Sequence, residues 1–202
     1  MYSHYDYKLK RNVVMLHPGE HYATTEDAFV STVLGSCVAV VLFDRELRLS
    51  GMNHYMLPGS KAQPRPQDRE MAGKLGVHAM ELLIGALLEK GARREKLEAK
   101  VFGGGNVLGI EDVHPGMKGS DIGAANVRFA FSYLKEKNIS VVSSDVEGYV
   151  ARKLFLDPPS GYVYLKRLEK VLLEPVRKAE LSVIEEMEKK PSAGTFELFE
   201  TS

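Results

Sequence analysis

Cysteine is nearly absent from this chain of 202 residues, which contains one cysteine and no tryptophan. A single cysteine excludes an intramolecular disulfide and fits a reducing compartment. An excess of charge of one sign is also lacking, because 27 basic residues balance 27 acidic ones. No strong field is therefore available to recruit nucleic acid or an anionic membrane. No apolar run approaches the roughly 18 residues needed to span a bilayer, so direct membrane insertion is not expected.

The remaining composition is typical of one globular domain, with 44% hydrophobic residues. The polar residues 1–8 lack the apolar core of a signal peptide, so we expect a soluble cytoplasmic protein. Apolar alternation and helical periodicity interleave along the chain, which predicts an α/β (α+β layered) fold whose hairpin-containing sheet core is flanked by helices. The expected strands are 13–16, 36–43, 48–57, 97–102, 139–142 and 162–168, and the expected helices are 70–90 and 121–137.

Both expected helices carry an apolar stripe for burial. In the first, the predicted buried stripe is Met71, Leu75, Ala79, Leu82 and Ala86. In the second, the residues predicted to face inward are Val127, Phe131 and Leu134.

The composition changes after Leu168, which predicts a main domain over residues 1–170. Residues 171–202 are expected to form a charge-rich helix and a flexible C-terminal tail. Phe196 and Phe199 in that tail either dock on the domain or recruit a partner by strand addition.

Cys37 and His54 are the candidate catalytic residues, and the alternative is a buried structural cysteine near an incidental histidine. Cys37 begins an unbroken apolar run that indicates a buried strand, and His54 follows seventeen residues later at the end of a second strand. A hairpin centred on Arg45-Glu46 places Asp44 opposite Leu47 and Cys37 opposite His54, at the open end of the hairpin. A thiol beside an imidazole is the core of acyl-transfer chemistry.

The residues before Cys37 suit a substrate site. Gly35 and Ser36 are small, so a substrate backbone has room to approach the thiol. Ser31 and Thr32 carry hydroxyls that are able to orient an imidazole or to bind an amide. The glycines at 103–105 do not match the spacing of a nucleotide-binding motif and are interpreted as a turn or a site-lining loop. No cofactor or metal is expected.

Five ordered segments between Val13 and Leu168 resemble the CheD family of chemoreceptor glutamine deamidases. The resemblance is carried by Gly35-Ser36-Cys37-Val38-Ala39-Val40, Gly51-Met52-Asn53-His54-Tyr55-Met56-Leu57-Pro58, Lys100–Asn106, Asp121–Asn126, and Ser144–Gly148 with Arg152 and 161–167. The resemblance implies Cys37 as nucleophile and His54 as general base. It also implies a third catalytic hydroxyl six positions before the cysteine, which is Ser31 here, with Thr32 as the alternative. Glu147 stands where the family usually has glycine.

The implied activity is hydrolysis of specific glutamine side chains on methyl-accepting chemotaxis receptors to glutamate, with release of ammonia, as part of chemotaxis adaptation. A CheC-type phosphatase is an implied partner. Two alternatives share parts of this sequence pattern. One is another Cys–His acyl-transfer enzyme, and the other is a non-catalytic module that binds a phosphatase or a receptor.

Overall fold

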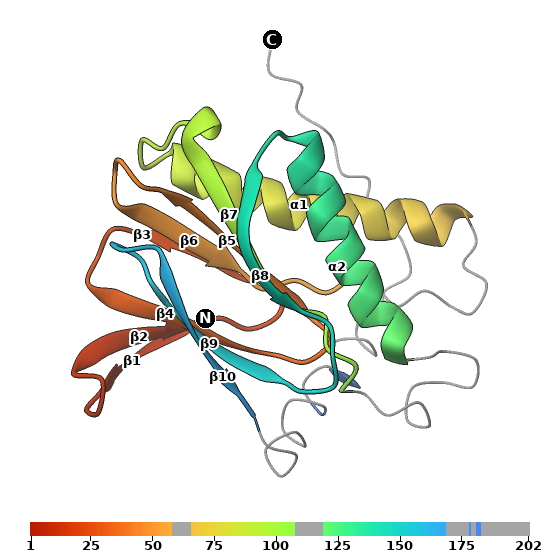
Figure 1. Cartoon of the computed structure of the whole chain (residues 1–202), viewed down its shortest axis with the longest axis horizontal. Coiled ribbons are helices and arrows are strands. Elements are labelled where there is room, and N and C mark those ends of the chain that lie inside the picture. The colour runs from red at the N-terminus through yellow and green to blue at the C-terminus, as the bar shows by residue number, and fades with distance from the viewer. Residues whose placement is uncertain (58–65, 108–118, 169–177, 179–180, 183–202) are drawn as a thin grey trace.

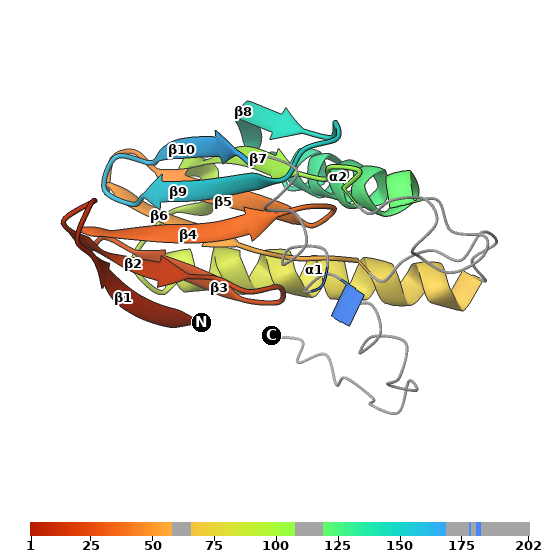
Figure 2. The same cartoon turned by 90° about the horizontal axis from the view of Figure 1, so that it is seen from below.

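Two five-stranded sheets and a layer of helices build the protein. The computed structural model describes residues 1–57, 66–107, 119–168, 178 and 181–182. The first sheet has the order β1-β2-β4-β9-β10, and the second has the order β3-β6-β5-β7-β8. Figures 1 and 2 show the second sheet between the first sheet and the helices. The layered α+β fold predicted from the sequence is confirmed, with the helices on one side only.

The first sheet contains strands from both ends of the described chain. Its members are β1 (Tyr2–Asp6), β2 (Arg11–Met15), β4 (Ala28–Leu34), β9 (Arg152–Asp157) and β10 (Tyr162–Arg167). β4 runs parallel to β2 and antiparallel to β9, so it lies at the centre of the sheet. Three of these strands, β1, β4 and β9, are additional to those expected from the sequence.

The second sheet has β5 (Val38–Asp44) at its centre and helices on one face. The other members are β3 (His21–Thr24), β6 (Leu49–Asn53), β7 (Leu97–Gly103) and β8 (Ser140–Val146), and β3 is also additional to the expected strands. Helices α1 (Pro66–Leu88) and α2 (Gly119–Glu136) cover the outer face, and a short 3-10 helix, Arg94–Lys96, precedes β7. None of the helices in the described ranges combines the length and apolar character that a membrane crossing requires.

Each face of β5 contributes to a different core. One core lies between the sheets and includes Ala39 and Val41. The other lies between the second sheet and the helices and includes Val38, Val40 and Leu42. Because both faces are covered, all seven residues of β5 are buried, which explains its continuous apolar sequence.

The buried stripe of α1 agrees only in part with the predicted one. Ala79 and Ala86 pack partly buried against the core, as predicted, and the side chain of Met71 lies outside the described residues. Leu75 and Leu82 are 38% and 39% exposed. The side chains that α1 places in the core are Met80, Leu83, Ile84 and Leu87. In α2 the prediction is confirmed for Val127 and Leu134, which are buried, and Phe131 packs partly buried against the same core.

The expected β5–β6 hairpin forms in a register two residues away from the predicted one. Asp44 pairs with Leu49 rather than with Leu47. The connecting loop covers residues 45–48, because Asp44 Oδ1 accepts the N–H groups of Glu46 and Leu47 at 3.0 and 3.2 Å. The predicted direct opposition of Cys37 and His54 is therefore wrong.

The predicted domain boundary near residue 170 is not tested by the structure. Most of the charge-rich segment 171–202, including Phe196 and Phe199, lies outside the described residues. Of that segment the structure describes 178, 181 and 182, and Leu181 packs against the core between the sheets.

Candidate active site

Cys37 lies directly before β5, at the end of the two sheets that is opposite the 45–48 loop. Its side chain is fully buried and belongs to the core between the sheets. Hydrogen bonds to their carbonyl oxygens fix Gly35, Ser36 and Cys37. Gly105 N–H donates to Gly35 O at 2.7 Å, Gly104 N–H donates to Cys37 O at 2.7 Å, and Asn126 Nδ2 donates to Ser36 O at 2.9 Å. The thiol is thus carried on a segment held by both β7 and α2.

The last residue of β7, Gly103, lies directly against the backbone of Cys37. Gly103 has φ 108°, and a Cβ placed there would be 2.2 Å from Cys37 O. Only glycine tolerates both the left-handed backbone and this close approach. Gly103 ends β7, and Gly104 and Gly105 follow it. The interpretation of residues 103–105 as a turn or a site-lining loop stays a prediction.

His54 directly follows β6, and its backbone is bonded on both sides. His54 N–H donates to Glu20 O at 2.9 Å, and Gly19 N–H donates to His54 O at 2.7 Å. The next residue, Tyr55, exchanges two backbone hydrogen bonds with Val38, at 2.9 and 3.0 Å. The imidazole therefore projects from a rigid strand end.

Cys37 and His54 lie on the same face of the second sheet. The bridge between Val38 and Tyr55 continues the β5–β6 register, so Ala39 is opposite His54 and Cys37 is opposite Met56. Cys37 and Met56 belong to the same core. A two-residue change of register preserves the face because side chains alternate with a period of two. The two side chains are diagonal neighbours instead of directly opposed ones.

Thr32 anchors the imidazole from the opposite sheet. Its Oγ1 is 2.7 Å from His54 Nδ1 and donates to Leu16 O at 2.9 Å. The Thr32 hydroxyl has one proton, which it donates to Leu16 O. Its oxygen must therefore accept a hydrogen bond from His54, so the proton of the neutral imidazole is on Nδ1. In this tautomer the lone pair of the imidazole is on Nε2, which is buried and accepts no hydrogen bond from the residues that the structure describes.

Burial controls the protonation of His54, which is 3% exposed. The loss of solvent lowers its pKa from 6.5 to about 4, and His17 acts in the same direction. The backbone hydrogen bond to Leu16 and the charge of Glu20 act in the opposite direction and raise the pKa of His54. The imidazole is therefore neutral near pH 7, with its Nε2 lone pair available as a base.

Ser31 is directed away from the imidazole. Thr32 lies between Val30 and Leu34, which face the core between the sheets, whereas Ser31 is on the alternate face of β4. Its Oγ donates to Leu154 O at 2.7 Å. Of the two hydroxyls proposed from the sequence, the structure brings Thr32 to His54.

Asn126 of α2 is the residue of this region that sequence reasoning did not assign. It is fully buried, and its side chain bonds the backbone on both the Cys37 and the His54 segments. The only sequence signal was its place in the Asp121–Asn126 motif, without an indication of what it contacts.

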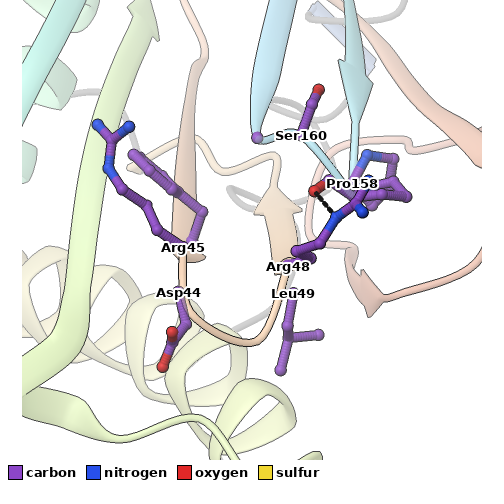
Figure 3. A pocket seen from close by; sticks show the side chains of 9 residues that line it. Asp44, Arg45, Arg48, Leu49, Pro158 and Ser160 are labelled. Atoms are coloured by element: carbon purple, nitrogen blue, oxygen red, sulfur yellow. Dashed lines mark hydrogen bonds between the residues drawn. The ribbon is translucent and has the colours of Figure 1, made fainter.

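A pocket of about 160 Å³ lies at the other end of β5 (Figure 3). Arg45, Arg48 and Ser160 line it, together with the loop that follows β9. Because this pocket adjoins the 45–48 loop, it is separated from Cys37 by the length of the strand. Among the described residues, no group of three His, Cys, Asp or Glu side chains is arranged to hold a metal ion.

A buried thiol and a hydroxyl-anchored imidazole on one sheet face make up a candidate site of the Cys–His type. Residues 56–167 match the family described as CheD chemotactic sensory transduction. The chain is 39% identical to the probable chemoreceptor glutamine deamidase CheD 1 of Shewanella oneidensis, over 97% of this chain and 92% of that protein. It is 38% identical to the probable chemoreceptor glutamine deamidase CheD of Laribacter hongkongensis, over 98% and 92% of the two chains. With the probable chemoreceptor glutamine deamidase CheD of Methylobacillus flagellatus the identity is 39%, over 90% and 87%. This chain belongs to the CheD family, as its sequence motifs predicted.

Proposed function

We propose that this protein hydrolyses the side-chain carboxamide of specific glutamines on methyl-accepting chemotaxis receptors, producing glutamate and ammonia. The names of its relatives, which describe probable chemoreceptor glutamine deamidases, support the reaction class. The substrate would be the helical cytoplasmic hairpin of the receptor, which implies a cytoplasmic location. A CheC-type phosphatase stays a predicted partner through the family resemblance.

The observation that carries the proposal is the hydrogen-bond chain from His54 through Thr32 to Leu16. It leaves Nε2 as the basic nitrogen on the face of the sheet that also carries Cys37. A third group that orients the base is the arrangement by which cysteine nucleophiles are activated. We therefore assign Cys37 as nucleophile, His54 as general base and Thr32 as the residue that orients His54.

The first half of the reaction forms a thioester. The proton of the Cys37 thiol passes to His54 Nε2 while Sγ bonds to the carboxamide carbon of the glutamine. Because burial keeps the free imidazole neutral, this proton moves during the attack rather than before it. The proton then passes from Nε2 to the departing nitrogen, the C–N bond breaks, and ammonia leaves a γ-glutamyl thioester.

The second half consumes one water. His54 Nε2 takes a proton from the water while its oxygen bonds to the thioester carbon. The C–S bond breaks, the proton returns to Sγ, and the glutamate side chain is released. The cycle ends with the thiol and the neutral imidazole in their initial states.

The test is incubation of the protein with a cytoplasmic receptor fragment, with ammonia measured by a coupled assay and the fragment mapped by peptide mass spectrometry. Conversion of glutamine to glutamate is expected with the wild type and not with Cys37→Ala. Cleavage of the fragment or attachment of an amine would instead assign another acyl-transfer activity. Wild-type protein that binds the fragment with no change in its mass would overturn the enzymatic proposal.

A further inference from the structure

The N-terminal half of α2 lies against both catalytic segments. A Cβ at Gly123 would be 2.5 Å from Gly104 O, so the helix and the loop after β7 are in direct backbone contact. Gly104 in turn donates its N–H to Cys37 O at 2.7 Å. The contact between these two glycines therefore sets how closely α2 approaches the segment that carries the thiol.

Asn126 lies one turn further along α2 and bonds to both segments. Its Nδ2 donates to Ser36 O at 2.9 Å, directly before Cys37. Its Oδ1 accepts the N–H of Leu57 at 2.8 Å, three residues after His54. The backbone carbonyl of Asn126 accepts the hydroxyl of Tyr55 at 2.8 Å. One residue thus makes three bonds to the two segments that carry the catalytic pair.

The chemistry of these bonds requires a carboxamide. The site has one carbonyl to satisfy and one N–H to satisfy, and a carboxamide has a donor and an acceptor at the matching positions. A carboxylate offers the acceptor but not the donor, and an alanine offers neither. Asn126 is fully buried, so water does not replace a lost bond easily.

We infer that Asn126 is the positioning residue of the Cys37–His54 pair, because it holds the thiol segment and the imidazole segment at a fixed separation. This role rests on the proposed function and adds to it a residue that does not touch the reacting atoms. Cys37 and His54 lie at the open end of the hairpin, where the Val38–Tyr55 bridge joins the two strands. The bonds to Asn126 add a connection through α2 on each side of this bridge.

The experiment compares Asn126→Ala and Asn126→Asp with Leu134→Ala, a matched control on the same helix. Leu134 is fully buried in the core beneath α2, so its truncation is expected to lower the melting temperature. It has no bond to either catalytic segment in the described structure. All assays are made well below the melting temperature of the least stable variant.

Asn126→Ala is expected to lower kcat for receptor-fragment deamidation by about 100-fold, the scale expected for misplacing a reacting group by about 1 Å. The value of kcat for Leu134→Ala is expected to stay close to that of the wild type. Equal losses of kcat in the two variants, or a wild-type kcat in Asn126→Ala, would overturn the inference.

Asn126→Asp adds a second measurement, the pH dependence of kcat, which a loss of stability alone would not change. A buried aspartate is expected to have a raised pKa, and its protonated form regains a donor for Ser36 O while still accepting from Leu57 N–H. Its kcat relative to the wild type should therefore rise as the pH falls from about 8 to about 5.5. Burial keeps His54 and Tyr55 neutral over this range, since it lowers the pKa of the first to about 4 and raises that of the second. Measuring the wild type at each pH removes from the comparison any pH dependence of kcat that comes from Cys37, because both proteins contain this residue.

Amide hydrogen exchange at Leu57 separates this inference from the proposed function. Asn126→Ala should accelerate exchange of that N–H, whereas Leu134→Ala should not. If the wild type proves inactive on receptor fragments, the proposed function fails and the exchange result alone decides the structural part. If the wild type is active and exchange at Leu57 is unchanged in Asn126→Ala, the positioning role is wrong while the proposed function stands.

Discussion

Acidification is expected to destabilise this protein through His54, and the size of the effect follows from its burial. The unfolded chain binds a proton at His54 below pH 6.5, whereas the folded protein does so only below about pH 4. Between these values the unfolded state holds more protons, so the free energy of unfolding falls as the pH falls. Above pH 6.5 both states are neutral at this residue and the full contribution is present.

The expected loss is about 3 kcal/mol at pH 4, from about 1.4 kcal/mol for each pH unit between the two pKa values. A loss of this size is a large part of the stability of a typical domain. It is measured by urea unfolding at a series of pH values between about 7.5 and 4, comparing the wild type with His54→Gln.

The difference between the two proteins isolates His54, because the carboxylates whose stability contributions also change in acid are common to both. Glu46 and Glu81, for example, have pKa values lowered by neighbouring hydrogen bonds and titrate in either protein. His78, which is exposed on α1, provides the matched control His78→Gln. The reasoning is refuted if His54→Gln and the wild type lose stability in parallel down to pH 4, or if His78→Gln reproduces the effect.

Five further substitutions, arranged in three tests, examine other parts of the structure. Thr32→Val removes the acceptor of His54 Nδ1–H and should lower kcat by about 100-fold. Ser31→Ala should lower the free energy of unfolding in urea by about 1 kcal/mol and leave kcat nearly unchanged. The reverse pattern would make Ser31 the third catalytic residue. Gly103→Ala should destabilise the fold by on the order of 3 kcal/mol in urea unfolding, because Gly103 has a positive φ and contacts a backbone oxygen. Gly85 lies inside α1 with open space around it, so Gly85→Ala should stabilise the fold by about 1 kcal/mol in the same urea assay. Glu147→Gly should raise the melting temperature measured by calorimetry. Glu147 has φ 61°, and relief of this left-handed backbone is worth about 1 kcal/mol. A lower melting temperature would show that the Glu147 side chain stabilises the fold by more than its backbone strain destabilises it.

The local pattern of the sequence determined that the two candidate catalytic residues share one face of the second sheet. The apolar run before Asp44 and the alternation after it identified β5 and β6, and the period of two placed Cys37 and His54 on one face. That conclusion survives the two-residue error in register, because an even change of register leaves the face unchanged. The error itself came from the loop, where the side chain of Asp44 selects a four-residue turn.

The partners of each element were decided by the tertiary structure. Along α1, helical periodicity offers two overlapping stripes, and only packing against β3 and β6 decides that Leu83 is buried while Leu82 is exposed. For the same reason the sequence left Ser31 and Thr32 as alternatives. Their distinction depends on which face of β4 meets the second sheet. β4 itself was not expected, and one of its two pairing strands, β9, lies far away in the sequence.

The motif that ends at Asn126 shows the same division. The sequence identifies it as a segment shared with a family, through residues that are adjacent along one helix. Its contacts are to Ser36, which is ninety residues away, and to Leu57, which is sixty-nine residues away. Local periodicity contains no information about such separations. Folding alone brings the thiol, the imidazole and this carboxamide together, because each is carried by a different element that the two cores hold in place.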